Sequence, residues 1–324
     1  MLNKRQFVGA LGAALAAPKA VWAQPYPSKP ITIVVGYSAG GSSDLVARKL
    51  AVGLQKRLGQ SVVVENRPGG NVIIAAQYIA NARPDGYTIF LSTSAPYSMN
   101  PTLYRKLPYD PETAYSAISV LCHVPQAIQV PGDSAHASLR DYVRFGRENR
   151  GKLNYGSAGS ASQSRLEMEM FNTGVGIEGT HIGFQGSAPA FVALMSAQVD
   201  SVFTDTSGSL DFIKTGKIRA LALASDQRLP SLPDVPTLAE AGFPDLKIPA
   251  VWFGLFGPPK LPQEIVAAIA AAAREEMGTA EMAEFMGKFG IVAMQRTAAE
   301  MGKLIRQDAQ AYGAVIERLN LKLD

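Results

Sequence analysis

The sequence predicts an α/β protein, because two hydrophobic patterns alternate along the chain. Short apolar, β-branched runs typical of buried strands alternate with segments whose apolar residues recur at helical spacing. Short links rich in glycine, proline and serine separate these segments. Such alternation favours a parallel sheet with crossover helices. At 324 residues the chain is long enough for about two domains, each with its own core.

The first third of the chain begins with strand, glycine-rich loop and helix. Residues 31–35 are a continuous β-branched run, and after the loop the apolar residues from Val46 to Leu58 recur at helical spacing. The pattern then repeats as strand, turn, helix and strand at residues 62–64, 66–70, 72–79 and 87–91. We therefore expect neighbouring strands linked by helices in this part of the chain.

The remaining elements follow the same alternation up to a proline-rich stretch at residues 229–249. Strands are expected at residues 127–130, 153–155, 199–203 and 218–224. Helices are expected between them at residues 139–147, 162–172, 188–196 and 210–215. After the proline-rich stretch the sequence predicts a strand at 251–256 and helices at 263–277, 280–289 and 298–319.

Charge and cysteine content exclude several classes of function. The chain has 31 basic and 27 acidic side chains, and the first 23 residues hold three of the basic ones and no acid. The remainder is nearly neutral and lacks a basic stripe with interleaved aromatic residues, so we expect no nucleic-acid partner. Cys122 is the single cysteine, which excludes an internal disulfide and a cysteine-based zinc site. A small buried thiol is the expected state of Cys122.

The first 23 residues have the features of an export signal. Lys4 and Arg5 precede an apolar stretch at residues 7–17, and Val21-Trp22-Ala23 forms a small-x-small cleavage site. The apolar stretch is about half of the ~20 residues that a membrane span needs. A membrane anchor or a buried helix are the alternatives. We expect cleavage near Ala23 and a mature protein outside the cytoplasm.

Three loops rich in glycine and serine are candidates for anion binding. They cover residues 37–44, 92–95 and 156–162, and each follows an apolar strand. Ligands of open α/β sheets bind at the carboxyl ends of strands, where backbone N–H groups at a helix start can hold an anion. Ordinary capping and turn formation is the alternative for each loop. Asp44 is expected to hold its loop together and not to contact the anion.

One motif suggests a hydrolase instead. Residues 36–40 match G-x-S-x-G between a strand and a helix, which would make Ser38 a nucleophile. No earlier strand exists to complete an oxyanion hole, and the three histidines, at positions 123, 136 and 181, all have sequence contexts typical of structural residues. We therefore keep the serine hydrolase as the less favoured reading.

Eight ordered motifs resemble one known family, the extracytoplasmic solute receptors of tripartite tricarboxylate transporters, also called Bug receptors. The resemblance covers the chain from about Pro27 to Leu319. Its motifs are VGYSAGGSSDLVAR (35–48), LGQSVVVENRPGG (58–70), ARPDGYT (82–88), NPTLYRKLPYD (100–110), GKLNYGSAGSAS (151–162), GKIRALAL (216–223), LPDVPTLAEAG (232–242) and WFG (252–254).

The resemblance implies a two-lobed type II periplasmic binding protein fold with a ligand cleft between the lobes. It implies a signal peptide at 1–23, a discontinuous lobe 1 at 24–124 and 251–324, and lobe 2 at 125–250. It also implies a periplasmic, monomeric, non-enzymatic receptor without cofactor or metal. Such a receptor delivers a small carboxylate, such as a di- or tricarboxylate, an acidic amino acid or an aromatic acid, to the membrane permease subunits. A sensory receptor that acts on a signalling partner is the alternative.

The family's ligand contacts fall on the candidate loops. Carried over by position, they are Tyr37, Ser38, Ala39, Gly40, Gly41 and Ser94 in lobe 1, and Ser157, Ala161, Ser162, Phe184 and Asp205 in lobe 2. For Asp205 the alternative is N-capping of the following helix.

Two departures from the family pattern concern the cleft. Arg165 stands where the family commonly has histidine, and residues 181–186 read HIGFQG where HVPYKG is frequent. Arg165 could hold a second carboxylate or be a solvated helix charge, and both readings stay open. A ligand transferred from a relative is therefore in doubt.

Overall fold

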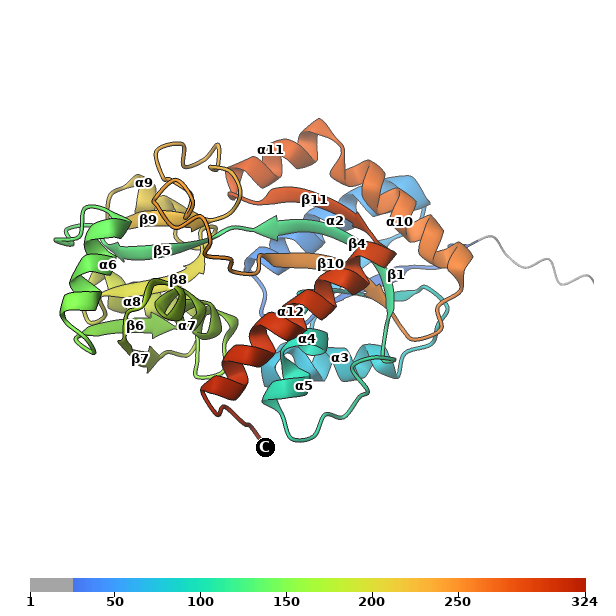
Figure 1. Ribbon diagram of the computed structural model, residues 1–324. Coiled ribbons are helices and arrows are strands. Elements are labelled where there is room, and N and C mark those ends of the chain that lie inside the picture. The colour runs from blue at the N-terminus through green and yellow to red at the C-terminus, as the bar shows by residue number, and fades with distance from the viewer. Residues whose placement is uncertain (1–25) are drawn as a thin grey trace, which may run out of the picture.

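Two separate β-sheets form the framework of the protein in the computed structural model, which describes residues 26–324 (Figure 1). Helices cover both sheets, so the α/β prediction is correct. We call the unit around the six-stranded sheet lobe 1 and the unit around the five-stranded sheet lobe 2. The expected export signal and its cleavage site after Ala23 lie outside the described residues.

Lobe 1 is built on a mixed sheet with the strand order β11-β4-β10-β3-β1-β2. Its strands are β1 (Ile31–Val35), β2 (Val62–Asn66), β3 (Thr88–Ser92), β4 (Ser116–Val124), β10 (Val251–Gly257) and β11 (Val292–Thr297). β1 pairs in parallel with β2 and β3, whereas β10 runs antiparallel to both of its neighbours, β3 and β4. The expectation of a parallel sheet is therefore wrong for β10, because this strand enters the sheet on the chain's return from lobe 2.

Lobe 2 is built on a sheet with the order β7-β6-β8-β5-β9. Its strands are β5 (Gln126–Pro131), β6 (Leu153–Ser157), β7 (Gly179–Gly183), β8 (Ser201–Asp205) and β9 (Ile218–Ala224). β6 is parallel to β7 and β8, and β5 is antiparallel to β8 and β9. The expectation of a parallel sheet is therefore wrong for β5 as well, and in lobe 1 also for β11, which is antiparallel to β4. The chain enters this lobe across Pro125, between β4 and β5, and leaves it through the stretch between β9 and β10.

All predicted helices and strands are present, with their ends shifted by a few residues. The helices of lobe 1 are α2 (Ser42–Leu58), α3 (Ile73–Ala80), α10 (Gln263–Met277), α11 (Ala280–Lys288) and α12 (Ala298–Arg318), with the short η1 (Gly70–Val72), α4 (Ala95–Ser98) and α5 (Asn100–Leu103). Those of lobe 2 are α6 (Leu139–Glu148), α7 (Gln163–Val175), α8 (Ser187–Met195) and α9 (Leu210–Lys214). Within residues 26–324, none of these helices has the length and apolar character to cross a membrane.

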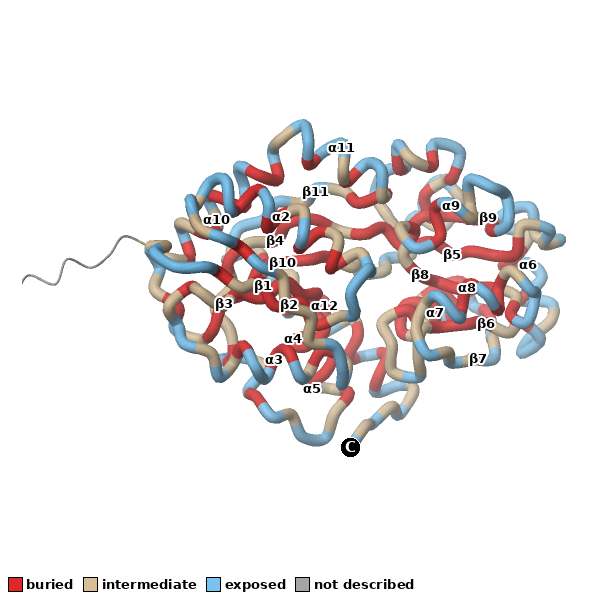
Figure 2. Tube along the Cα trace, turned by 180° about the vertical axis from the view of Figure 1, so that it is seen from behind, coloured by how far each residue is buried: buried red, intermediate tan, exposed pale blue. Residues whose placement is uncertain are grey.

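The hydrophobic core of lobe 1 lies on both faces of its sheet, as the buried strands in Figure 2 show. In β1, Ile31, Ile33 and Val35 pack in the cluster that includes α2 and α10, whereas Val34 packs on the other face with Phe90. This alternation follows from the two-residue period of a strand. A strand buried on both faces reads as a continuous apolar run, which is why the sequence predicts β1 so clearly.

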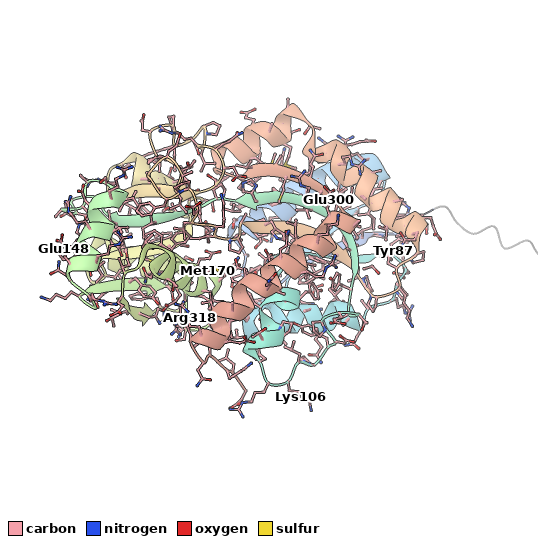
Figure 3. All side chains as sticks on the ribbon, in the orientation of Figure 1. Tyr87, Lys106, Glu148, Met170, Glu300 and Arg318 are labelled. Carbon is pink, nitrogen blue, oxygen red and sulfur yellow. The ribbon has the colours of Figure 1, made fainter. Side chains whose placement is uncertain are left out.

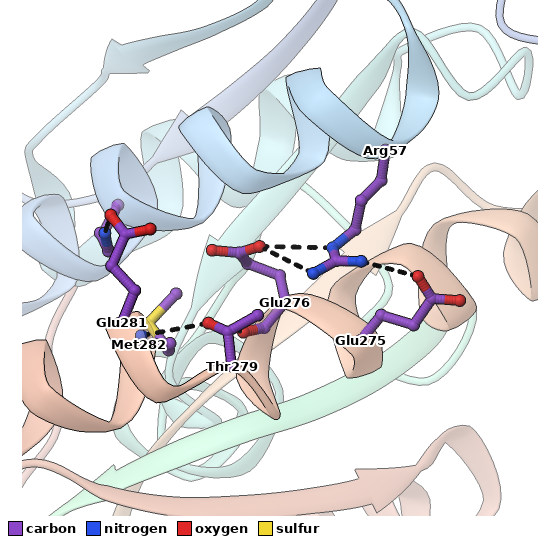
Figure 4. Close-up of polar contacts among 7 residues, drawn as sticks. Arg57, Glu275, Glu276, Thr279, Glu281 and Met282 are labelled. Atoms are coloured by element: carbon purple, nitrogen blue, oxygen red, sulfur yellow. Dashed lines mark hydrogen bonds and ion pairs between the residues drawn. The ribbon is translucent and has the colours of Figure 1, made fainter.

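A glycine allows α2 and α10 to pack closely. A Cβ on Gly53 would lie 2.0 Å from Cδ of Glu276, so the glycine leaves room for that carboxylate. Glu276 in turn accepts from Nε and Nη2 of Arg57 at 3.3 and 3.2 Å, and Glu275 accepts from Nη1 at 2.7 Å (Figure 4). The packing of these two helices therefore includes a partly buried ion pair next to the apolar contacts.

Helix α12 joins the two lobes. Its first half packs on β4 of lobe 1 and its second half lies against α7 of lobe 2 (Figure 1). Near its end, Arg318 donates to Thr173 and pairs with Glu169, close to Met170 in Figure 3. One turn and a half earlier, the Tyr312 hydroxyl accepts from Gln163 Nε2 at 2.7 Å. The last helix thus makes polar and packing contacts with both lobes.

Candidate functional site

A cavity of about 830 Å³ lies between the two lobes. Lobe 1 contributes the β1–α2 loop, the end of β3 and residues near the start of β10 and β11. Lobe 2 contributes the first residues of α7 and α8 and the segment after β8. The carboxyl ends of β1, β3 and β8 therefore face one space, which is where open α/β sheets bind their ligands.

The β1–α2 loop is held in shape by Asp44. Its Oδ2 accepts from the Gly40 N–H and from Arg48 Nε, both at 2.9 Å, and its Oδ1 accepts from Asn66 Nδ2 at 3.0 Å. Burial opposes ionisation of Asp44, but the hydrogen bonds from Arg48, Gly40 and Asn66 outweigh it and lower the pKa below its usual value. The expected loop-holding role of Asp44 is confirmed.

Two helices from opposite lobes begin at this cavity without a side-chain cap. Gly41 precedes α2 and Gly186 precedes α8, and neither helix start receives a side-chain hydrogen bond from its capping residue. Both glycines line the cavity, as do the first helical residues, Ser42 and Ser187. The first N–H groups of a helix have no partner within the helix and carry its positive dipole end. Each lobe therefore presents backbone donors to an anion in the cavity.

Helix α7 begins at the same cavity but is capped. The Ser162 hydroxyl accepts from the Arg165 N–H at 3.3 Å and donates to the Gly159 carbonyl at 2.7 Å. Ser162 lines the cavity all the same. The Ser162 hydroxyl therefore caps α7. This is the capping alternative that the sequence left open for this loop.

A strained segment borders the cavity in lobe 1. Asn71 and Val72 both have positive φ, 53° and 73°, which is rare for a β-branched residue such as valine. Val72 is buried, and a Cβ on Gly36 would lie 2.3 Å from its Cγ1. Asn71 lines the cavity, and its Nδ2 lies 3.4 Å from the Ala161 carbonyl of lobe 2. Sequence reasoning missed Asn71, although the two preceding glycines marked an unusual turn.

Two buried acids lie near α12, and one of them, Glu167, lines the cavity. Glu167 of α7 lines the cavity, accepts from the Tyr312 hydroxyl at 3.2 Å through Oε1, and has no hydrogen-bond partner at its buried Oε2. Burial raises its pKa well above the usual value, against the hydrogen bonds from Tyr312 and Gln163. Burial likewise raises the pKa of Asp308 to about 6.

Five of the eleven predicted contact residues line the cavity: Tyr37, Gly40, Gly41, Ser162 and Asp205. The cavity wall omits the other six, Ser38, Ala39, Ser94, Ser157, Ala161 and Phe184. Ser38 and Ala39 belong to the lining loop but are exposed. The ligand contacts of all eleven stay a prediction.

The remaining four of these side chains have partners inside the protein. Ser94 donates to Asp308 at 2.5 Å, and Ser157 lies 2.6 Å from Nε2 of His181. Ala161 packs in an apolar cluster that spans both lobes. Phe184 packs over Gly156, where an added Cβ would lie 3.2 Å from its ring.

Asp205 lies at the cavity and holds a turn, but it is not the N-cap of the following helix, which the sequence left open as its alternative role. It lines the cavity, and its Oδ1 accepts from the Ser207 hydroxyl at 2.5 Å and from the Gly208 N–H at 3.1 Å. These bonds close the turn before α9, whose own capping position is Ser209. Asp205 therefore holds a turn, and a ligand would meet a carboxylate whose position is already set.

The geometry favours neither a hydrolase nor a cleft role for Arg165. Of the histidines, His181 contacts Ser157, and burial together with the charge of Arg165 lowers its pKa to about 4. His136 packs against aromatic rings, and no hydrogen bond joins any of the three described histidines to Ser38.

Arg165 is half-buried, donates to the Ser160 carbonyl at 2.6 Å and is absent from the cavity wall. Residues 26–324 contain no cluster of acidic, histidine and cysteine side chains suited to a metal.

Comparison with known proteins identifies the family. The family described as the tripartite tricarboxylate transporter family receptor matches residues 46–321. The chain belongs to this receptor family. The receptor is 30% identical to protein BugT of Bordetella pertussis over 312 residues, 96% of this chain and 95% of BugT.

Two solved structures with ligands resemble the receptor over nearly their whole length. One is an R. palustris protein with adipate, at a TM-score of 0.82 and 29% identity, which covers 92% of this chain and all of that one. The other is MatC from Rhodopseudomonas palustris with bound malate, at 0.77 and 27%, covering 90% and 100%. The receptor therefore has the two-lobed fold of periplasmic solute-binding proteins, as the sequence resemblance implied. Its family is in general non-enzymatic and periplasmic.

Proposed function

We propose that this receptor captures a small organic carboxylate between its lobes and delivers it to the membrane subunits of a tripartite tricarboxylate transporter. The observation that carries the proposal is the pair of uncapped helix starts, α2 in lobe 1 and α8 in lobe 2, at one cavity. A carboxylate has two oxygens with two lone-pair directions each, so it can accept N–H groups from both lobes at once. It can therefore stabilise a closed arrangement of the lobes.

Closure of the lobes follows from this arrangement. A ligand that contacts both lobes binds the closed state more tightly than the open one and shifts the population toward it. We propose the boundaries expected from the sequence, 124/125 and 250/251, as the hinge, because each falls in a connection between the two sheets. The closed state then differs in shape from the empty receptor, and the membrane subunits can recognise that difference.

Three further properties belong to the same proposal. The mature protein begins at Gln24, it acts as a monomer in the periplasm, and it has no enzymatic activity. The adipate and malate in the two related structures support a carboxylate as ligand class. The predicted contacts, from Tyr37 to Asp205, are the residues through which we expect the ligand to be held.

A thermal-shift screen of the mature chain tests the proposal. The panel pairs each acid with its amide, so that charge is the main difference between the two members. An acid present at 100 times its Kd adds about 2.7 kcal/mol of stability and raises Tm, whereas the amide does not. A panel in which no acid raises Tm, or in which the amides act equally, contradicts carboxylate capture.

A further inference from the structure

The charges and apolar side chains of the cavity wall indicate which carboxylate fits. We propose that the receptor selects a monocarboxylate whose remainder is an apolar ring or branched chain, and that it discriminates against a second carboxylate. This inference rests on the proposed function and narrows its ligand class. It is carried by the charges, the hydrogen-bond partners and the apolar side chains of the cavity wall.

The described cavity wall contains no lysine, arginine or histidine, but it contains the carboxyl groups of Glu167 and Asp205. Backbone N–H groups at the helix starts can balance one carboxylate. A second ionised carboxylate has no cationic side chain to replace the water that it loses. It also enters a space that already holds Asp205. Charge therefore favours a ligand with a single negative group.

Several neutral polar side chains of the wall, among them both glutamines, already have partners within the protein. Gln126 Nε2 donates to the Val124 carbonyl at 3.1 Å, Gln163 Nε2 donates to the Tyr312 hydroxyl, and Tyr37 and Thr93 are hydrogen-bonded to each other at 2.8 Å. The Glu167 side chain is fully covered from solvent, so its carboxyl group is out of a ligand's reach in this conformation. A second carboxylate would have to break one of these contacts to gain a donor from the glutamines, Tyr37 or Thr93, which leaves it uncharged donors such as serine and threonine hydroxyls.

Apolar side chains from both lobes occupy the remaining wall. Lobe 1 contributes Phe253, Phe289 and Ile291. Lobe 2 contributes Phe191, Val192 and Phe212. Val192 is 61% exposed, the highest value among the exposed large hydrophobic side chains of the described residues. A ring or branched chain held between these groups would remove apolar surface of both lobes from water, which favours its binding.

Matched pairs of acids test this inference by isothermal titration calorimetry on the mature chain. Benzoate is paired with terephthalate, and 4-methylvalerate with 2-methylglutarate, in which a carboxylate replaces one methyl group, so that each pair differs chiefly by one carboxylate. We expect the monoanion of at least one pair to bind at least tenfold more tightly than its dianion. Dianions that bind as tightly as their monoanions, or more tightly, overturn the selectivity but leave carboxylate capture intact. Absence of binding by every acid overturns both proposals.

A charge-removing variant identifies the group responsible. In Asp205→Asn, which keeps an acceptor for the turn, the ratio of dianion to monoanion affinity should rise at least threefold. The matched control is Asp234→Asn, because Asp234 is an exposed acid outside the cavity wall. The control should leave the ratio unchanged. An equal change in both variants would assign the discrimination to net charge and refute the role of Asp205.

Discussion

Replacement of Ser42 by proline removes one backbone donor from the proposed anion site while keeping the fold. Ser42 is the first residue of α2, and Gly41 before it is extended, with φ −77° and ψ 170°. Proline is favoured at the first helical position, where its missing N–H has no partner within the helix. An extended residue before proline is also the preferred conformation. The variant therefore deletes a ligand contact without breaking α2.

The expected loss follows from the worth of one hydrogen bond to a charged group. Such bonds contribute about 1.5–3 kcal/mol, and each 1.4 kcal/mol corresponds to a tenfold change in Kd. Ser42→Pro should therefore weaken carboxylate binding by about 10- to 150-fold. Ser42→Ala is the matched control, since it removes the hydroxyl but keeps the N–H. Its Kd shows how much of the loss in Ser42→Pro comes from the hydroxyl and how much from the N–H.

Isothermal titration calorimetry with an acid found in the thermal-shift screen measures both variants. Circular dichroism and Tm verify that each remains folded before the affinities are compared. If folded Ser42→Pro binds the acid within twofold of Ser42→Ala, the N–H of residue 42 does not hold the anion. The reasoning from the uncapped helix start would then be refuted for lobe 1.

Three other predictions concern the framework. Gly36→Ala places a Cβ 2.3 Å from Cγ1 of the buried Val72, so it should lower the free energy of unfolding in urea by about 1–3 kcal/mol. The control Gly287→Ala in α11, with open space around it, should be neutral or stabilising. Equal losses of stability in both variants would contradict the packing argument. Because the pKa of Asp308 is raised to about 6, the folded state binds its proton more tightly than the unfolded chain does. This group therefore adds up to about 3 kcal/mol to the free energy of unfolding as pH falls from 7 to 4. Asp308→Asn should flatten that part of the profile of stability against pH. A profile as steep in the variant as in the wild type would assign it to other groups. Burial raises the pKa of Cys122 to about 12, so iodoacetamide should label it only after unfolding, as mass spectrometry would show; rapid labelling of the native protein would disprove its burial.

The parts of the fold that the sequence predicts well are those whose burial produces a pattern. β1 and β10 are continuous apolar runs because both of their faces are covered. β7 and β11 are not predicted from the sequence, because most of their residues are half-buried or exposed at a sheet edge. β4 is also absent from the predicted strands; it is largely buried, but its apolar run is interrupted by Ser119 and His123. The antiparallel direction of β10 has no local signal either, since it depends on where the chain returns from lobe 2.

In the candidate site, too, a local sequence signal does not show which partner a side chain meets in the folded chain. The glycine loop at Tyr37 is recognisable because it lies between a clear apolar strand and a clear helical pattern, where its glycines allow close approach of the backbone to a ligand. Ser94 and Ser157 carry an equal local signal, yet their hydroxyls turn to partners that lie 214 and 24 residues away, Asp308 and His181. Glu167 lies at an unremarkable helix position, and only packing against α12 places it beside the cavity.

The position of β10 in the larger sheet determines the order in which the lobes can be completed. β3 and β4 do not pair with each other; β10 lies between them, and it begins only at residue 251. Every strand of the smaller sheet has been synthesised by residue 224. Pairing over long sequence separations is slow, since the intervening chain must first be closed into a loop. Lobe 2, although it lies in the middle of the chain, can therefore fold while synthesis continues, and lobe 1, which starts the chain, is finished last.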